Sequence, residues 1–237
     1  MRELLVKIAI RLGVYEWMMK LDNRREMRRQ NRAFKHHGLE TLETATAASR
    51  ASETQLFLAF GTLLGAYRNK GFIPYDCDLD TGLMGSQLSD AFMESMARAG
   101  LRHIRRYYVK ATGRVCEDKF EYKGVHIDVH YFYDDGEGNL FCDLCLPHET
   151  KDWRSANQTD GFPSIIRVVP RSTFSLQDFL GIQCYMPDNT VEWLKALYGE
   201  NFMTPDPHWS MGDHKKRSQS RGERLYRVEF TCPTVRE

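Results

Sequence analysis

The chain has 237 residues, of which 42% are hydrophobic and 27% are charged, and its 33 Lys and Arg nearly balance 32 Asp and Glu. This composition is typical of a globular protein and excludes a fibrous or wholly disordered chain. The net charge of +1 excludes a general attraction to nucleic acid, and six cysteines at irregular spacing favour reduced thiols over a disulfide framework.

Residues 4–19 carry apolar side chains at alternating three- and four-residue steps, which predicts an amphipathic helix. Charged residues interrupt this segment, so it matches neither a membrane span nor a secretory signal, and we expect a cytoplasmic protein. Residues 1–37 hold ten Lys and Arg but only four Asp and Glu. This excess favours a solvated helix surface, and it leaves open peripheral contact with anionic lipid at the inner face of a membrane.

The next elements expected are a helix that continues from residue 39 and a short buried strand over residues 56–60. Gly61 is expected to end that strand. Thr62 is a candidate N-cap for a brief helix through Arg68, because a threonine hydroxyl accepts a hydrogen bond from the first free amides of a helix.

Residues 77–82 predict a strand, because Cys77, Leu79 and Thr81 alternate with Asp78, Asp80 and Gly82. Asp78 and Asp80 are two residues apart, so the pleat of that strand places both carboxylates on one face. Cys77 points to the opposite face.

Ser89 predicts the N-cap of a helix that Gly100 ends. Beyond it, residues 119–122 and 125–132 have the composition of two strands that meet at a turn around Gly124. Most of this region is therefore expected to be sheet.

Residues 134–139 predict a turn that leads into a strand over residues 140–144. Residues 150–164 have no periodicity and read as a loop that could border a site. A short helix is expected over residues 191–198, and the polar, basic residues 213–227 are expected to form a loosely held tail.

Asp78, Asp80 and Asp128 form the acidic constellation of the sequence. Two carboxylates on one face of a strand can hold Mg²⁺ against the diphosphate of a substrate, because this ion prefers carboxylate, phosphate and water oxygens. Asp128, on a neighbouring strand, would bind a second ion or accept a proton from an attacking hydroxyl, and the sequence leaves both roles open. Surface Asp-x-Asp pairs are often only solvated, so the pair alone does not establish a metal site.

Basic and phosphate-facing groups accompany these acids. Gly61, Thr62 and the amides at the start of the following helix are candidates for contact with phosphate oxygens. Arg68 and Lys70 would add positive charge, although a surface salt bridge explains Arg68 equally well.

Two further groups have less specific patterns. His126 and His130 flank Asp128 on its strand face, where a structural role is the more common one. Cys142, Cys145 and His148 are three soft ligands at short spacing, but a structural zinc site normally needs four.

Residues 60–80 resemble the LicD/fukutin family, whose members have there a Gly-Thr-Leu-Leu-Gly segment, an Arg, a Gly-x-Ile-Pro and an aspartate cluster. Residues 187–205 are also similar to the closing helix of that family. The resemblance implies an α+β nucleotidyltransferase-like fold, a mixed sheet flanked by helices. It divides the chain into a helical extension over 1–50, a catalytic domain over 51–207 and a basic tail over 208–237.

By position, the resemblance makes Asp78 and Asp80 metal ligands, Asp76 an adjoining acidic residue that contacts substrate, and Asp128 the third carboxylate. Many bacterial members have an unbroken Asp-Asp-Asp-x-Asp cluster, in which Cys77 here replaces the second acid. Because the pleat points Cys77 away from the pair, we expect activity to survive this substitution.

The function implied is a LicD-type phosphotransferase that uses Mg²⁺, with Mn²⁺ as the alternative ion. It would move phosphocholine, ribitol phosphate or a similar group from a nucleotide diphosphate donor to a glycan or glycolipid acceptor, as in lipopolysaccharide or capsule modification. Two alternatives stay open: nucleotidyl transfer from a nucleoside triphosphate, and a non-catalytic, membrane-associated scaffold of a glycan assembly system.

Overall fold

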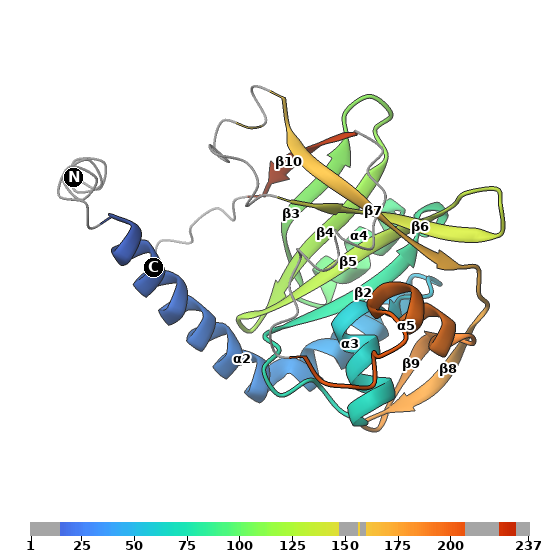
Figure 1. Cartoon of the computed structure of the whole chain (residues 1–237), viewed down its shortest axis with the longest axis horizontal. Coiled ribbons are helices and arrows are strands. Elements are labelled where there is room, and N and C mark those ends of the chain that lie inside the picture. Colours follow the sequence, from blue (N-terminus) through green and yellow to red (C-terminus); the bar gives the residue numbers. More distant parts are fainter. Residues whose placement is uncertain (1–14, 147–155, 157–159, 207–222, 231–237) are drawn as a thin grey trace.

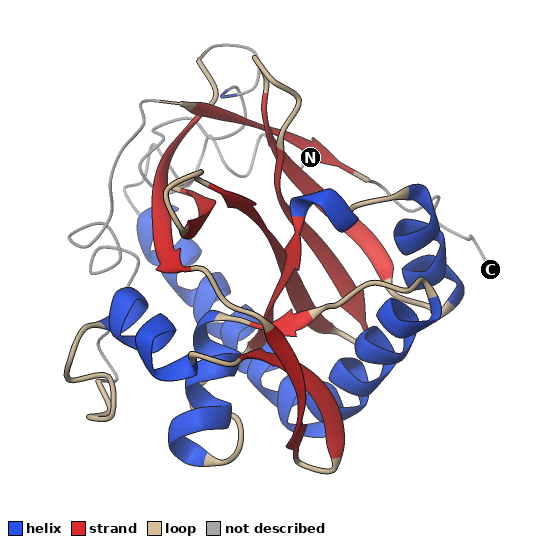
Figure 2. Cartoon of the chain, turned by 90° about the vertical axis from the view of Figure 1, so that its right-hand side faces the viewer, coloured by secondary structure: helices blue, strands red, loops and turns tan. Residues whose placement is uncertain are grey.

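The computed structural model describes residues 15–146, 156, 160–206 and 223–230. Ten strands of the described chain form one mixed sheet flanked by helices (Figures 1 and 2), which confirms the α+β class. The strands are β1 (Phe57–Leu58), β2 (Asp78–Met84), β3 (Arg102–Val109), β4 (Val115–Tyr122), β5 (Val125–Asp134), β6 (Asn139–Cys145), β7 (Phe162–Pro170), β8 (Phe174–Phe179), β9 (Ile182–Pro187) and β10 (Arg224–Glu229). The helices are α2 (Tyr15–Ala51), α3 (Phe60–Leu64), the π-helical η1 (Gly65–Asn69), the 3₁₀ turn η2 (Gly85–Gln87), α4 (Asp90–Arg98) and α5 (Thr190–Tyr198).

Helix α2 runs without a break for 37 residues, and its N-terminal half projects from the rest of the molecule (Figure 1). Phe34, Leu42, Ala45 and Ala48 recur at helical spacing and are buried where α2 packs on β2, β5 and α4. Residues 4–14 of the predicted amphipathic helix lie outside the described residues. Among the described helices, none combines the length and the apolar character of a membrane span. The cytoplasmic location stays a prediction.

The strand order is β4-β3-β10-β7-β6-β5-β2-β1-β9-β8, and β4 also pairs with β5. Since β5 pairs with β4 and its end pairs with β6, strands β3 to β7 together with β10 form a closed circuit of pairings. The circuit supplies most of a small second core, with Tyr107, Val109, Cys116, Cys145, Ala156, Phe162 and Leu225. Strands β2, β1, β9 and β8 continue from β5 over the main core.

Strand β10 shows that the expectation of a loosely held tail over residues 213–227 is wrong for its last residues. The backbone of β10 pairs with β3 on one edge and with β7 on the other. Leu225 is fully buried, and the Arg227 guanidinium lies over the ring of Phe162 at 5.2 Å. One inward apolar residue and paired backbone groups are enough to hold this strand between β3 and β7.

The predicted elements around α4 and the two hairpins are confirmed. The Ser89 hydroxyl accepts a hydrogen bond from the amide of Phe92, and Gly100 follows α4 with a positive φ of 85°. β4 and β5 meet at Lys123 and Gly124, whose φ angles are both positive at 50° and 80°.

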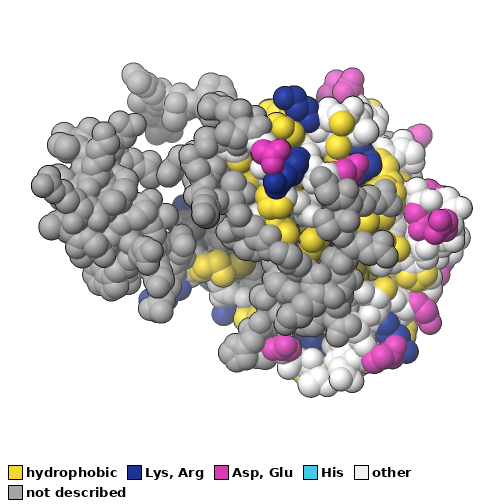
Figure 3. Space-filling view, turned by 45° about the horizontal axis from the view of Figure 1, so that its top comes forward, with side chains coloured by type: hydrophobic (Ala, Val, Ile, Leu, Met, Phe, Trp, Pro, Cys, Tyr) yellow, Lys and Arg dark blue, Asp and Glu magenta, His cyan; other side chains and the backbone are white. Residues whose placement is uncertain are grey.

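On the face shown in Figure 3, the described Lys and Arg side chains are interspersed with Asp and Glu.

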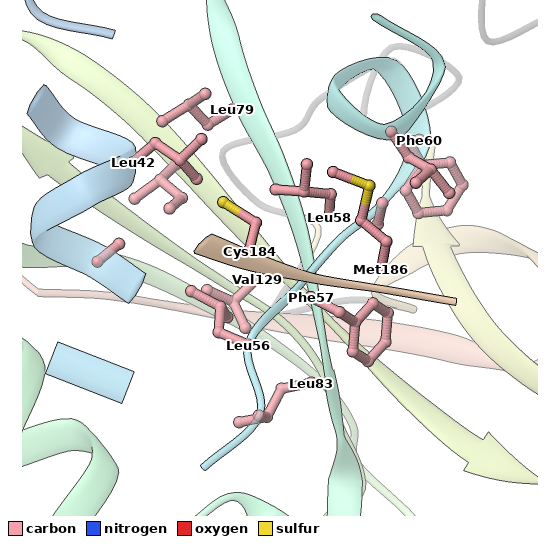
Figure 4. Close-up of a cluster of buried hydrophobic side chains, with 14 of the residues drawn as sticks. Leu42, Leu56, Phe57, Leu58, Phe60, Leu79, Leu83, Val129, Cys184 and Met186 are labelled. Atoms are coloured by element: carbon pink, nitrogen blue, oxygen red, sulfur yellow. The ribbon is translucent and has the colours of Figure 1, made fainter. Parts of the chain in front are cut away.

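Phe57 of β1 lies at the centre of the main core (Figure 4). Its ring stacks on Phe174 at 4.2 Å between centroids and meets the Trp193 ring edge-on at 5.7 Å. The Trp193 indole N–H donates to the Pro170 carbonyl oxygen at 2.8 Å, which ties α5 to the sheet. Gly82 of β2 makes room for the Phe57 ring, because the two residues are paired across β1 and β2.

Replacing Gly82 with alanine is expected to lower the free energy of unfolding by about 2–3 kcal/mol, since the new Cβ would lie 2.1 Å from Cε2 of Phe57. Urea denaturation measures this change. Gly71→Ala is the control, because the nearest atom to its added Cβ is the Asn69 carbonyl oxygen at 3.9 Å. Equal stability of the two variants would show that the Phe57 ring is free to move aside.

Candidate active site

The structure brings the three predicted acids to adjacent positions on two parallel strands. β2 and β5 pair so that Asp80 lies opposite Asp128 and Asp78 lies opposite His126. Asp78 and Asp80 are two residues apart on β2 and therefore share a face of the sheet with Asp128. The intervening Leu79 is fully buried in the main core on the opposite face.

The start of α3 holds Asp80 in place. The Gly61 amide donates to Oδ2 of Asp80 at 2.9 Å, and the Asp80 amide donates to the Thr62 hydroxyl at 2.9 Å. His130 of β5 places its Nε2 3.6 Å from the other carboxylate oxygen, Oδ1. These contacts fix β2 against α3, the helix that follows β1.

This arrangement overturns the predicted cap at Thr62. The N-cap of α3 is Ala59, and Phe60 already belongs to the helix with a φ of 38°, so β1 ends at Leu58 rather than at residue 60. The Thr62 side chain lies inside the helix, is 2% exposed, and accepts the Asp80 amide. Thr62 therefore positions Asp80 from within and does not face an opening.

Asp128 has one paired and one unpaired carboxylate oxygen. Its Oδ2 lies 3.0 Å from the Lys119 ammonium nitrogen on β4. Its Oδ1 is buried and has no hydrogen-bond partner among the described residues. Since a buried carboxylate oxygen is costly to leave unsatisfied, this atom is available to a ligand or an ion.

Several acidic side chains lie close to Asp80 and Asp128, and burial together with mutual repulsion raises their pKa values. Burial and then the charge of Asp80 raise the pKa of Asp76 to about 6. Burial, then Asp80 and Asp128, raise the pKa of Asp78 well above its usual value. Burial and then Asp128 also raise the pKa of Glu117. The site therefore favours any cation that neutralises this negative charge.

Two basic groups partly balance the acids. Burial alone would lower the pKa of Lys119, but the carboxylates of Asp128 and Glu117 raise it, so its ammonium stays charged. Burial would also lower the pKa of His130, and its contacts with Asp80 and Glu117 raise it instead. Nδ1 of His130 lies 3.9 Å from the Glu117 carboxylate.

Among the described side chains, no three His, Cys, Asp or Glu already surround one point as a complete metal site would. The donor set still fits Mg²⁺, which usually takes one or two protein carboxylates and completes its shell with water and substrate phosphate. Gly61 contributes space, because a Cβ there would lie 3.0 Å from Oδ2 of both Asp76 and Asp80. The missing side chain leaves a gap between two carboxylates.

A pocket of about 500 Å³ opens beside these acids. Gly61 and Asp76 line its end near β2, and Tyr198 at the end of α5 and Phe202 beyond it supply apolar walls. Arg68 also lines it and donates from Nη1 to the Phe202 carbonyl oxygen at 3.2 Å, so this residue lies at the pocket rather than on a remote surface. Lys70 lies apart, with its ammonium over the Tyr67 ring at 5.3 Å.

Cys142 and Cys145 do not form half of a zinc site. They are three residues apart on β6 and belong to different cores, Cys142 to the main core and Cys145 to the small one. His148 and most of the predicted loop over 150–164 lie outside the described residues.

Lys119, Glu117 and Tyr198 are site residues that the sequence did not single out. Lys119 and Glu117 alternate along β4 and face β5 opposite Asp128 and His130. The signal that could have found them is the predicted hairpin around Gly124, whose two-residue turn sets Lys119 opposite Asp128 and Glu117 opposite His130.

Comparison with known proteins agrees with this arrangement. Residues 53–171, half of the chain, match the family model described as LicD/FKTN/FKRP, nucleotidyltransferase domain. The chain belongs to this family. The family and the nucleotidyltransferase-like fold expected from residues 60–80 are thereby confirmed.

The LicD-family chain also aligns with two curated relatives. It is 25% identical over 194 residues to "Ribitol-5-phosphate transferase FKTN" of Mus musculus and 25% identical over 182 residues to the protein of the same name from Homo sapiens. The alignments cover 80% and 75% of this chain but 38% and 35% of the relatives. The chain thus spans little more than a third of the length of these proteins.

Proposed function

We propose that this chain transfers a phospho-alcohol or sugar phosphate, with ribitol phosphate as the first candidate, from a cytidine or other nucleotide diphosphate donor to a glycan hydroxyl. The observation that carries the proposal is the register of β2 and β5, which sets Asp80 opposite Asp128 with Asp78 on the same face. The pocket lined by Gly61, Arg68 and Asp76 begins beside these acids and has room for a nucleotide. Family membership and the FKTN relatives support the reaction class.

Asp78 and Asp80 are the proposed ligands of Mg²⁺, or of Mn²⁺ in its place, with the unpaired Oδ1 of Asp128 as a further oxygen. When bound, the ion supplies positive charge to the donor diphosphate, whose negative charge these acids would otherwise repel. The Gly61 amide and Thr62 keep Asp80 in its orientation. Lys119 holds the Asp128 carboxylate in place through its contact at 3.0 Å.

In the transfer step, the acceptor hydroxyl oxygen forms a bond to the phosphorus that carries the alcohol, and the bond from that phosphorus to the nucleoside monophosphate breaks. In the alternative in which Oδ1 of Asp128 does not bind the ion, this oxygen orients the hydroxyl and takes its proton; in either case the nucleoside monophosphate leaves with the bonding electrons. Tyr198 and Phe202 give the donor two apolar walls to pack against.

Product release from two donors tests the proposal. The full chain is incubated with CDP-ribitol or CTP, Mg²⁺ and a panel of alkyl glycosides, and nucleotides are separated by chromatography. We expect CMP from CDP-ribitol only when Mg²⁺ or Mn²⁺ is present, and none after addition of EDTA. Pyrophosphate release from CTP would support nucleotidyl transfer instead, and CMP release that resists EDTA would contradict the metal assignment.

A further inference from the structure

A second pocket of about 500 Å³ lies between α2 and the segment that leads into β2, and the proposed reaction gives it no role. Most of its polar lining is basic or amide, in contrast to the acidic face of β2. Its lining includes Arg28, Asn31, Arg32, Lys35, His36 and Tyr75.

Among the described side chains, the cations of this pocket have no ion-pair partner. Arg28, Arg32 and Lys35 are exposed and form no ion pair with any side chain that the structure describes. They are spaced by four and three residues and thus share one face of α2. Like charges at this spacing weaken a helix slightly, and the sequence offers no acid among them from residue 27 to residue 39.

The face of α2 that carries Arg28, Arg32 and Lys35 is hydrogen-bonded to the aspartate segment that leads into β2. The Asn31 amide nitrogen donates to the Asp76 carbonyl oxygen at 2.9 Å, which fixes this part of α2 beside the aspartate segment. Cys77 lines the pocket and directly precedes Asp78. Tyr75 is half exposed and lines both this pocket and the pocket beside Gly61, so it stands between the two.

We infer that this pocket binds a phosphate group of a substrate, through Arg28, Arg32 and Lys35. Guanidinium and ammonium groups bind phosphate oxygens through charge-assisted hydrogen bonds, and Arg does so with two parallel donors. An in-line displacement brings the attacking and leaving groups to the phosphorus from opposite sides, so two pockets separated by Tyr75 suit two substrates. This inference rests on the proposed function only for the identity of the substrate.

The phosphate has two candidate sources, the donor diphosphate and a phosphate carried by the acceptor. Both share the same chemistry, and inorganic phosphate is the probe for it. An anionic lipid headgroup is a third ligand with similar charge. The concave lining and the hydrogen bond from Asn31 to the aspartate segment favour a substrate over a membrane surface.

The first experiment is a ¹H–¹⁵N NMR titration of the full chain with inorganic phosphate at low ionic strength, read at the amides of Asn31, Tyr75 and Cys77. We expect saturable shifts, and at least about tenfold weaker binding in the double variant Arg32→Gln/Lys35→Gln, because two charge-assisted contacts are lost. Arg98→Gln/Lys195→Gln removes the same charge from exposed helical positions paired with Glu94 and Glu200, and it should bind phosphate as the unmodified chain does. Equal binding by both double variants, or no shift at these amides, would overturn the inference.

The second experiment identifies the source by calorimetric titration with CDP-ribitol, in the presence and absence of saturating phosphate. Weaker CDP-ribitol binding in Arg32→Gln/Lys35→Gln, with competition by phosphate, assigns the pocket to the donor. Unchanged CDP-ribitol binding alongside bound phosphate assigns it to the acceptor. Flotation with phosphatidylserine vesicles completes the set, and loss of vesicle binding alone, without any phosphate effect, would replace the substrate by a membrane. A chain that releases no CMP yet binds phosphate here would refute the proposed function and leave this site standing.

Discussion

Asp78→Asn and Asp80→Asn are each expected to reduce the rate of phosphoryl-group transfer by at least about a thousandfold, which corresponds to the loss of about 4 kcal/mol of transition-state stabilisation. Asparagine preserves the shape of the side chain but removes the charge that a divalent cation requires. Both residues lie on the face of β2 that turns toward Asp128. CMP release at saturating CDP-ribitol, with Mg²⁺ varied, measures the rate.

The same substitution at Asp78 is expected to stabilise the protein in the absence of metal. Burial and the charges of Asp80 and Asp128 raise the pKa of Asp78 well above its usual value, so its ionised form is disfavoured in the folded chain. A neutral amide relieves this repulsion and should raise the melting temperature by a few degrees, since about 1 kcal/mol moves Tm by roughly 2–4 °C in a protein of this size. Activity and stability would then move in opposite directions, as is common at functional sites.

Asp178→Asn provides the comparison, because this residue is exposed on β8 and caps a turn through the Gly181 amide at 3.4 Å. It should leave the rate and its Mg²⁺ dependence unchanged. Full activity in both Asp78→Asn and Asp80→Asn would refute the assignment of these acids. A fall in Tm for Asp78→Asn would instead indicate that Asp78 is a structural acid.

The acidic centre was predictable from the sequence because it depends on local patterns. The alternation around Asp78 and Asp80 predicts a strand, and turns with glycine at residues 124 and 134–139 predict the hairpins that place Asp128 on β5. Ser89 and Gly100 delimit α4 by capping preferences that need no tertiary information. The resemblance of residues 60–80 supplied the family.

Strands β3 and β7 were harder to predict because they carry charged side chains that pair with distant partners. Arg106 of β3 donates to both carboxylate oxygens of the fully buried Asp118 at 2.8 and 2.7 Å, across β3 and β4. Arg167 of β7 is 1% exposed and donates to the last carbonyl oxygens of α5. From the sequence alone, both arginines would be expected on the surface. Their burial is possible only because a partner 12 or 30 positions away accepts their hydrogen bonds.

The helix start at Phe60 was mispredicted for a different reason. Thr62 has the residue type of an N-cap, but its hydroxyl accepts the Asp80 amide from another strand, so a tertiary contact replaces the local one. The case of Lys119 differs, because the two-residue turn at Lys123 and Gly124 fixes the register that sets Lys119 opposite Asp128. That position follows from the predicted hairpin, whereas the contact between Thr62 and Asp80 joins two elements that no local rule brings together.

Lys119→Met is expected to lower the free energy of unfolding of the metal-free protein by about 3–5 kcal/mol, because it leaves the carboxylate of Asp128 buried without its cation. Methionine fills the same space without charge. Urea denaturation in EDTA measures the change. Lys123→Met removes an exposed lysine that pairs with Glu40 at the end of the same hairpin, and it should change stability little.

Two further measurements distinguish loss of the Lys119 charge from loss of the packing of its side chain. If the role of Lys119 is to neutralise the charge of Asp128, the double variant Lys119→Met/Asp128→Asn should recover most of the lost stability, and the double-mutant cycle gives the coupling between the two side chains. Mg²⁺ should also recover part of it in Lys119→Met, since a bound cation would take over the neutralising role of the lysine. If adding Asp128→Asn to Lys119→Met restored no stability, packing of the lysine stem, rather than its charge, would be what supports the site.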